Sequence, residues 1–375
     1  MKNVTKILFS LIKRGLSGDS AESITKDLSK ETLEELYRIS DKYDMAQFIT
    51  VSDSEFSEKF KKKQILALYR HQKSAYALDK ISKALNDAGV DFIPLKGAVI
   101  SKLYPESYLR TSCDIDILVH EKDLDKAIDV LSESLQYKAK GERDYHDISL
   151  YSPEGVHLEL HFNIRENMAN LDKVLDRVWD HSYREDGHLW RMKNEFLIFH
   201  TVTHMCYHFT WGGCGIRSFV DLYLMRDKLD YDENVLRAYL KEAEIEKFYD
   251  SVISLIEVWL GDKEHSELTQ KIEKYIFSGG IYGNNETRIA MQQGKSGGKI
   301  GFILSRLFLP LETLKSYYPI LNKYPWLYPF MIVRRFMRLI TKKAYKNASN
   351  ELKINGSVSK EKVNETKNFL KELGL

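Results

Sequence analysis

The stretch that decides the fold reads LKGAVISKLYPESYLRTSCDIDILV at residues 95–119 and is followed later by HLELHFNI at residues 157–164. In residues 114–119 (DIDILV), polar and apolar side chains alternate as they do in a half-buried β-strand. Residues two apart on a strand point to the same face, so Asp114 and Asp116 are predicted to project together. Two carboxylates aimed at one spot repel each other, and Mg²⁺ or Mn²⁺ is the usual counter-charge for such oxygen ligands.

A second alternating run, residues 156–164, places Glu159 and His161 on its polar side. Another strand-like run covers residues 145–151, and the turn signal Ser-Pro-Glu-Gly at residues 152–155 separates the two runs. This arrangement predicts a β-hairpin. If the second hairpin strand lies beside the strand with the paired aspartates, Glu159 becomes a third carboxylate at the same site.

Lys96 and Gly97 stand where a predicted strand at residues 90–95 gives way to a short helix. Free backbone N–H groups, a glycine that permits close approach and a nearby lysine are together suited to phosphate binding. These two residues are therefore predicted to bind nucleotide. Arg110 is a further candidate, either to orient the site or to bind phosphate, and an exposed arginine without such a role is the alternative.

The ordered set of Lys-Gly, Arg-x3-Asp-Ile-Asp and Glu-x-His resembles the polymerase-β-type nucleotidyltransferase superfamily. It is similar in particular to a bacterial branch described as an uncharacterised nucleotidyltransferase family. The resemblance implies that Asp114, Asp116 and Glu159 are the catalytic residues and the ligands of Mg²⁺ or Mn²⁺. It also implies transfer of a nucleoside monophosphate from an NTP to an acceptor hydroxyl, with release of pyrophosphate.

This sequence departs from the superfamily pattern at Lys96 and Gly97, where Gly-Ser or Gly-Gly is more usual. The departure removes the usual serine contact to the phosphates, and Ser101 is the candidate replacement. His161 either orients the nucleotide or packs beside Glu159. Neither the base of the NTP nor the acceptor follows from these motifs.

The predicted fold is α+β, with a small mixed-sheet nucleotidyltransferase core flanked by helical regions at both ends. The predicted parts are an N-terminal helical region (1–88), the α/β core (89–190), a C-terminal helical domain (191–346) and a polar tail with one short helix (347–375). The glycine-bearing segment 278–299 between two helical patterns is predicted to be a loop. Its Gly-Lys-Ser at 294–296 is not a phosphate-binding P-loop, because Ile289 stands where that motif requires glycine.

Three histidines, His200, His204 and His208, recur every four residues on one face of a predicted helix, with two cysteines nearby. Structural zinc normally takes paired ligands from two elements, so cleft-lining or core histidines are favoured over a zinc site. Arg217 and Asp221 are four residues apart and are candidates for an ion pair along the next helix. By the resemblance, these residues line the nucleotide cleft.

Residues 301–346 contain nine Lys or Arg and one acidic residue, interleaved with aromatic side chains, whereas the whole chain carries a net charge of only +2. Such a segment suits peripheral contact with an anionic membrane or with RNA, and the alternative is a helical domain with a basic rim. Three irregularly spaced cysteines favour a reducing compartment. No apolar run of 18 residues exists, so a cytoplasmic protein with at most peripheral membrane contact is predicted.

A second hypothesis belongs to another class of protein. In it, the same fold binds nucleotide without turnover and acts as a sensor or as an assembly factor at a membrane surface. Three intact carboxylates argue against this reading, and the missing serine argues for it. Metal-dependent turnover of an NTP separates the two hypotheses.

Overall fold

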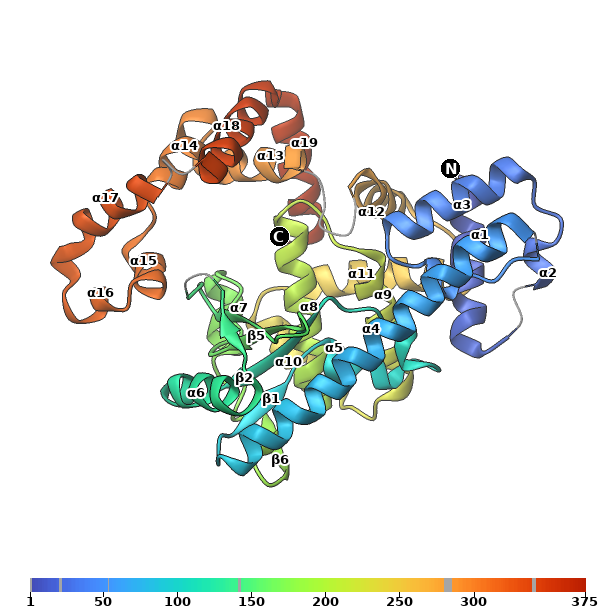
Figure 1. The fold of residues 1–375 in the computed structure, drawn as a ribbon. Coiled ribbons are helices and arrows are strands. Elements are labelled where there is room, and N and C mark those ends of the chain that lie inside the picture. The colour runs from blue at the N-terminus through green and yellow to red at the C-terminus, as the bar shows by residue number, and fades with distance from the viewer. Residues whose placement is uncertain (1, 20–21, 53, 141–142, 280–284, 339–341) are drawn as a thin grey trace.

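The structure is a computed structural model that describes residues 2–19, 22–52, 54–140, 143–279, 285–338 and 342–375. The N-terminal part of the chain is helical, as predicted. Its elements are α1 (Lys2–Ser17), α2 (Glu22–Thr25), α3 (Lys30–Lys42), the 3-10 turn η1 (Ala46–Phe48) and α4 (Ser54–Asp87). Helix α4 runs diagonally across the molecule from this helical region to the sheet (Figure 1). It therefore connects the N-terminal helical region to the sheet as one continuous helix.

The α/β core follows α4. Its strands are β1 (Phe92–Pro94), β2 (Asp114–Val119), β3 (Lys138–Ala139), β4 (Asp147–Tyr151), β5 (His157–His161), β6 (Ser182–Asp186) and β7 (Leu189–Met192). Its helices and 3-10 turns are α5 (Gly97–Ile100), η2 (Ser101–Leu103), η3 (Ser107–Leu109), η4 (Glu121–Asp123), α6 (Leu124–Leu135) and α7 (Ala169–Leu175). Within the described residues the strands form one mixed sheet in the order β3-β4-β5-β2-β1-β7-β6.

The register of the sheet confirms the predicted strand arrangement. Strands β4 and β5 pair antiparallel across the predicted turn, and β5 lies parallel to β2. Asp116 is the direct partner of Glu159, and Asp114 is the partner of His157. The three carboxylates therefore meet on adjacent strands.

One face of the sheet is covered by the end of α4 and by α6. Ile81 of α4 and Leu131 of α6 pack there against Ile115 and Ile117 of β2. Because side chains alternate along β2, this packing turns the neighbouring aspartates to the opposite face. A register slip by one residue would bury the aspartates in the apolar cluster, so the packing specifies the position of the site.

The C-terminal part is helical. Its elements are α8 (Asn194–Thr210), α9 (Ile216–Lys228), α10 (Glu233–Glu242), α11 (Glu246–Trp259), α12 (Glu267–Ser278), α13 (Asn285–Ser296), α14 (Lys299–Leu307), α15 (Leu311–Tyr317), α16 (Ile320–Lys323), η5 (Pro325–Leu327), α17 (Tyr328–Arg338), α18 (Lys342–Ser357) and α19 (Lys360–Leu373). Helices at both ends and the mixed sheet between them confirm the predicted α+β class. Among the described residues, every helix is too short or too polar to cross a membrane.

Three local predictions differ from the structure. The segment predicted as a loop at 278–299 contains α13, because Ile289 and Ala290 of this helix are buried in a small apolar cluster with Phe302 and Val358; residues 280–284 lie outside the described part. The C-terminal tail contains α19 and most of α18, where one short helix was predicted. The hairpin of β6 and β7 was not predicted, because its strands are short and β6 is mostly polar, although Asp186 and Gly187 form a typical hairpin turn signal.

Candidate active site

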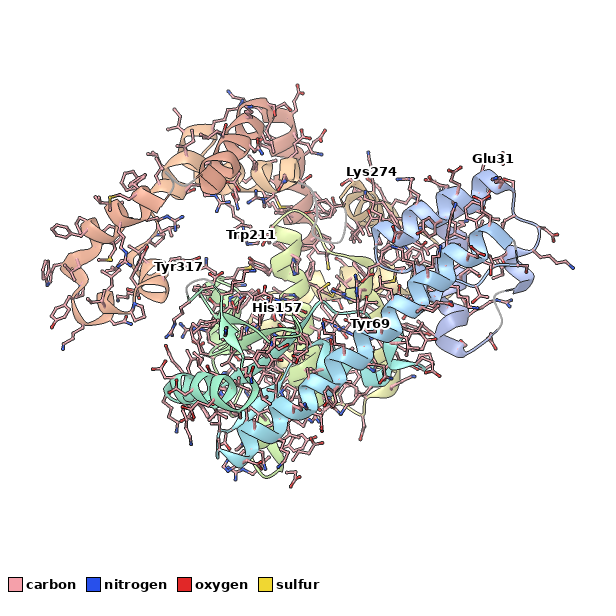
Figure 2. All side chains as sticks on the ribbon, viewed as in Figure 1. Glu31, Tyr69, His157, Trp211, Lys274 and Tyr317 are labelled. Carbon is pink, nitrogen blue, oxygen red and sulfur yellow. The ribbon has the colours of Figure 1, made fainter. Side chains whose placement is uncertain are left out.

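The centre of the candidate site is the shared face of β2 and β5. Asp114, His157 and Glu159 form one group of metal-ligating side chains, and Asp116, Glu159 and His161 form a second. Within each group the ligand atoms all lie within 4.8 Å of one another. Glu159 belongs to both groups, so it could bridge two cations held by the two aspartates. His157 marks this position near the middle of the molecule (Figure 2).

The electrostatics of these carboxylates fit a bound cation. Burial raises the pKa of Asp114, and the negative charges of Asp116 and Glu159 raise it further. The Nδ1 atom of the buried His161 ring has no hydrogen-bond partner in the described part of the chain. Unrelieved repulsion between carboxylates, with an imidazole alongside, suits a divalent cation with oxygen and nitrogen ligands.

Lys96 supplies the positive charge that the carboxylates face within the protein. Its Nζ atom donates a hydrogen bond of 3.0 Å to Asp116 Oδ1, and its side chain is 25% exposed. Burial alone would lower the pKa of Lys96, but the charge and hydrogen bond of Asp116, together with the charges of Glu166 and Glu159, outweigh burial and raise it. Burial would likewise raise the pKa of Asp116, yet Lys96 and then His161 hold it well below its usual range.

The backbone at Lys96 is strained. Its φ angle is 43° and its ψ angle is −111°, a region that non-glycine residues rarely adopt. The strain lies between the end of β1 and the start of α5, and it accompanies an ammonium group directed at Asp116. Strained residues concentrate at functional sites, where the surrounding structure imposes them.

His161 completes the buried charge cluster around Asp116. Its Nε2 atom lies 3.0 Å from Asp116 Oδ1 and 3.7 Å from Glu159 Oε2. Burial lowers the pKa of His161, but the hydrogen bonds to Asp116 and Glu159 dominate and raise it to about 9. The ring stacks on His146 with 5.2 Å between centroids, and burial lowers the pKa of His146 to about 4. An imidazolium thus lies against a neutral imidazole.

Gly97 allows the site to pack tightly next to Lys96. A Cβ atom there would lie 2.7 Å from Arg110 Nη1 and 3.2 Å from Ser112 Oγ, so a side chain would require both neighbours to move. Ser112 donates a hydrogen bond of 2.8 Å to Asp114 Oδ1. Ser101 is buried and lies near the same turn.

A cavity of about 440 Å³ opens beside this turn. Its walls come from the Gly97 turn, from Ser112 and Asp114, and from the middle of α4 through Ser74 and Leu78. The volume lies in the range of small-molecule sites. The candidate metal ligand Asp114 is therefore reached from a cavity large enough for a nucleoside.

Arg110 has a different environment from the one predicted. Its Nε and Nη2 atoms donate hydrogen bonds of 2.9 Å to the two carboxylate oxygens of Asp221, and both side chains are buried. Tyr104 donates a third hydrogen bond, of 2.7 Å, to the same carboxylate. The suggested pair of Arg217 with Asp221 is replaced by this one, and Arg217 instead donates to the Thr111 carbonyl oxygen at 2.7 Å.

The three histidines of α8 lie beside the carboxylate site. His204 Nδ1 is 2.9 Å from Glu166 Oε1, and the Nε2 atoms of His204 and His208 are 3.0 Å apart. Together with Lys96 and His200, these rings line a small pocket of about 80 Å³. Among the described residues they form no metal-ligating group, so the cleft-lining interpretation describes their environment and the zinc alternative is unsupported.

Several of these groups were not singled out as site residues from the sequence, namely Ser112, Glu166, His146, His157 and Tyr104. His157 and Ser112 had a usable signal, because both lie two residues from a predicted metal ligand on the same strand or its extension. Glu166 lies in an irregular segment between β5 and α7, where no periodicity predicts its direction. It meets His204 only through the tertiary fold.

Comparison with known proteins assigns the family. No curated protein and no solved structure matches the chain at a significant level. The sequence model of a family described as "Uncharacterised nucleotidyltransferase" matches residues 39–261. The match covers the sheet, the carboxylates of β2 and β5 and the helices α8 to α11. Because it spans more than half of the 375 residues, the chain belongs to this nucleotidyltransferase family.

Proposed function

We propose that the protein transfers a nucleoside monophosphate from an NTP to an acceptor hydroxyl and releases pyrophosphate. The observation that carries this proposal is the register of β2 and β5, which brings Asp114, Asp116 and Glu159 onto one face. Three carboxylates beside a cavity match the chemistry of nucleotidyl transfer, where position and charge neutralisation do most of the work. Mg²⁺ or Mn²⁺, when bound by these carboxylates, would neutralise the triphosphate and lower the pKa of the attacking hydroxyl.

The reaction balances around the α-phosphorus. The acceptor oxygen forms a bond to this phosphorus, and the bond from the phosphorus to the bridging oxygen of the β-phosphate breaks. Glu159 takes the proton of the acceptor hydroxyl in this proposal, because it is more exposed than Asp116, with 26% of its side chain accessible against 4%. Pyrophosphate leaves with the negative charge.

Lys96 and Gly97 bind the phosphates in this proposal. The ammonium group of Lys96 would leave Asp116 for the phosphates once a cation occupies the carboxylates. Gly97 leaves room for a close approach of phosphate to its backbone, with Ser101 alongside. Arg110 binds phosphate through its Nη1 atom in this proposal. This nitrogen lies next to Gly97, whereas Nε and Nη2 bind Asp221. His161 holds Glu159 and Asp116 in place beneath the nucleotide.

We also propose that residues 89–190 form the catalytic unit and that the other helical parts, 1–88 and 191–346, enclose its substrates. The cavity next to Asp114 already combines α4 with the sheet, which supports an N-terminal contribution. The polar pocket on the other side of Lys96 is lined by α8 and α9, which supports a contribution from the C-terminal helices.

Pyrophosphate release from each of the four NTPs, with Mg²⁺ or Mn²⁺, tests the function in the presence of sugar, small-molecule, protein and RNA acceptors. We expect release with at least one acceptor and its loss in the Asp114→Asn variant. Nucleotide binding without pyrophosphate release under every condition would contradict catalysis and favour a nucleotide sensor of the same fold.

A further inference from the structure

The end of the C-terminal helical part forms a small unit with its own apolar core. We call residues 309–338, which include α15, α16, η5 and α17, the distal arm. Leu314, Tyr318, Leu321 and Ile332 are its buried core, and this cluster is separate from the main core of the molecule. In Figure 1, α15, α16 and α17 lie at the outer end of a projection that leaves the body through α13, α14 and α18.

Helix α17 buries one face and exposes another that is equally apolar. Its inner face packs through Ile332 on the small core of the arm. Its outer face, with the preceding turn, carries Trp326, Phe330, Val333 and Met337, whose exposed fractions are 67%, 62%, 57% and 62%. The spacing of three and four residues places Phe330, Val333 and Met337 on one stripe of α17, and Trp326 precedes this stripe by four residues in the turn η5. Four large apolar groups in one exposed stripe mark an interaction surface.

The stripe points away from the body of the protein. Burial raises the pKa of Tyr317, the nearby Asp144 of the α/β core raises it further, and Arg335 lowers it, so Arg335 lies on the side of the arm that is near the core. Val333 lies about 200° around the helix from Arg335, because each residue advances the helix by about 100°. Figure 2 likewise shows Tyr317 on the side of the arm that faces the sheet. A flat partner could therefore reach the stripe without meeting the rest of the molecule.

The charge around the stripe identifies the partner as anionic. Lys323 and Arg334 are exposed beside it, and the distal arm as a whole has five basic residues against Glu312 alone. A second copy of this chain is disfavoured, because two arms joined through their stripes would bring two strongly basic surfaces together. RNA is disfavoured by the stripe itself, since the aliphatic side chains of Val333 and Met337 offer no ring for base stacking.

We propose that the outer face of α17 binds the surface of a bilayer that contains anionic lipids. An apolar stripe with a tryptophan, flanked by Lys and Arg, is the pattern of a helix that lies in the membrane interface. The basic residues attract the anionic headgroups, and the four apolar side chains enter the boundary between headgroups and acyl chains. The inference stands on the arm alone and does not depend on the proposed transfer reaction.

Co-sedimentation of the full chain with vesicles tests the proposal. Vesicles of phosphatidylcholine are compared with vesicles that also contain phosphatidylserine, each at low and at high salt. We expect binding to the anionic vesicles at low salt, at least roughly tenfold weaker binding at high salt, and little binding to neutral vesicles. Equal binding to both compositions, or none to either, would overturn the proposal.

Variants distinguish the stripe from general surface charge. Phe330→Asp and Arg334→Glu should each weaken vesicle binding by roughly tenfold or more. Ile65→Asp is the matched control, because Ile65 lies on α4, far along the chain, and is also 57% exposed. If all three variants bind vesicles like the wild type, the stripe is not the contact.

RNA binding that Phe330→Asp abolishes, without vesicle binding by the wild type, would assign the arm to nucleic acid and overturn the proposal. Self-association abolished by the same change would overturn it in favour of a second copy.

Discussion

Two ion pairs, Arg110–Asp221 and Lys96–Asp116, lie close together and differ in their burial and in how many hydrogen bonds join the two partners. In the first pair two guanidinium nitrogens bind both oxygens of the carboxylate, and Tyr104 donates a further hydrogen bond. The two side chains are only 6% and 5% exposed. In the second pair a single ammonium group binds one oxygen, and the lysine side chain is 25% exposed.

The difference indicates what each pair does. The Arg110–Asp221 pair satisfies its own groups and connects the segment before β2 to α9, so its role is to fix the helical domain against the core. The Lys96–Asp116 pair leaves charge unbalanced, since Asp114, Asp116 and Glu159 are three carboxylates against two positive charges, Lys96 and the protonated His161. A pair that needs a further positive charge is suited to bind a ligand.

The largest expected effect is on the incompletely neutralised pair. Asp116→Asn should reduce pyrophosphate release by roughly a thousandfold or more, because loss of a metal ligand removes several kcal/mol of transition-state stabilisation. Its unfolding midpoint in urea should fall less than that of an Asp221 variant. Lys96 and the protonated His161 lose a charged partner, but the asparagine oxygen still accepts the hydrogen bond from Lys96, and repulsion with Asp114 is relieved. Steady-state rates and urea unfolding measure the two quantities. Wild-type turnover by this variant would contradict the site.

The Arg110–Asp221 pair should show the reverse behaviour. Asp221→Ala leaves Arg110 buried without its partner, so we expect a loss of about 3–5 kcal/mol in the free energy of unfolding. Urea unfolding measures this loss. The double variant Arg110→Met, Asp221→Leu serves as the control, and it should recover much of the stability because no charge stays buried. An unfolding free energy unchanged in Asp221→Ala would show that the pair does not join the two regions.

A variant of Lys96 tests whether its ammonium group competes with the metal ion for Asp116 or supports the carboxylates. In Lys96→Met the nucleotide dissociation constant should rise about tenfold or more, through loss of a charge-assisted phosphate contact of about 1.5–3 kcal/mol. Mn²⁺ binding without nucleotide should become tighter, because a competing positive charge 3.0 Å from Asp116 is removed. Titration calorimetry measures both affinities. Weaker Mn²⁺ binding would mean that Lys96 supports the carboxylates rather than competing for them.

The stability of the metal-free protein should depend on pH through His161. The folded-state pKa of His161 is raised from 6.5 to about 9, so its stabilising contribution is present below pH 6.5 and is lost as the pH rises through about 9. We expect a fall on the order of 2 kcal/mol in the free energy of unfolding across this range. Urea unfolding in a chelating buffer measures it. A wild-type pH dependence identical to that of His161→Gln would contradict the charge cluster.

The sequence predicted the centre of the site because short-range rules place it there. Alternation along β2 assigns Asp114 and Asp116 to one face, and a recognisable turn predicts the hairpin that contains Glu159. The position of that hairpin beside β2 was only a condition of the prediction, because it depends on the parallel pairing of distant strands. The fold class followed from the same change in periodicity, between helical and strand-like runs. These features depend on residues close together in the chain.

What the sequence did not predict depends on contacts between distant residues. Arg110 meets Asp221 and Glu166 meets His204 only because α8 and α9 pack beside the sheet, and one sequence contains no periodic signal for that packing. The middle of α4 shows a related limit. Ile65 and Tyr69 lie in a pattern of near-helical spacing, yet they are exposed, because each lies about 200° around the helix from Ala67, which is on the buried side of this stretch.

The smallest expected effect concerns Ser112, which influences the pKa of Asp114 beside the Lys96–Asp116 pair. Ser112 donates a hydrogen bond of 2.8 Å to Asp114, and this bond opposes the rise in the pKa of Asp114 that burial and neighbouring charges cause. In Ser112→Ala the pKa of Asp114 should rise further, so the acidic limb of the rate–pH profile should move to higher pH. Above the acidic limb, where the rate no longer changes with pH, the rate should fall by only about threefold to tenfold, as expected for one hydrogen bond of about 1 kcal/mol. Ser74→Ala, on the α4 wall of the same cavity, is the matched control and should leave the acidic limb in place. If Ser112→Ala lowers the rate equally at every pH, the serine positions Asp114 without influencing its charge, and the ionisation of Asp114 is then set by its carboxylate neighbours and by Lys96.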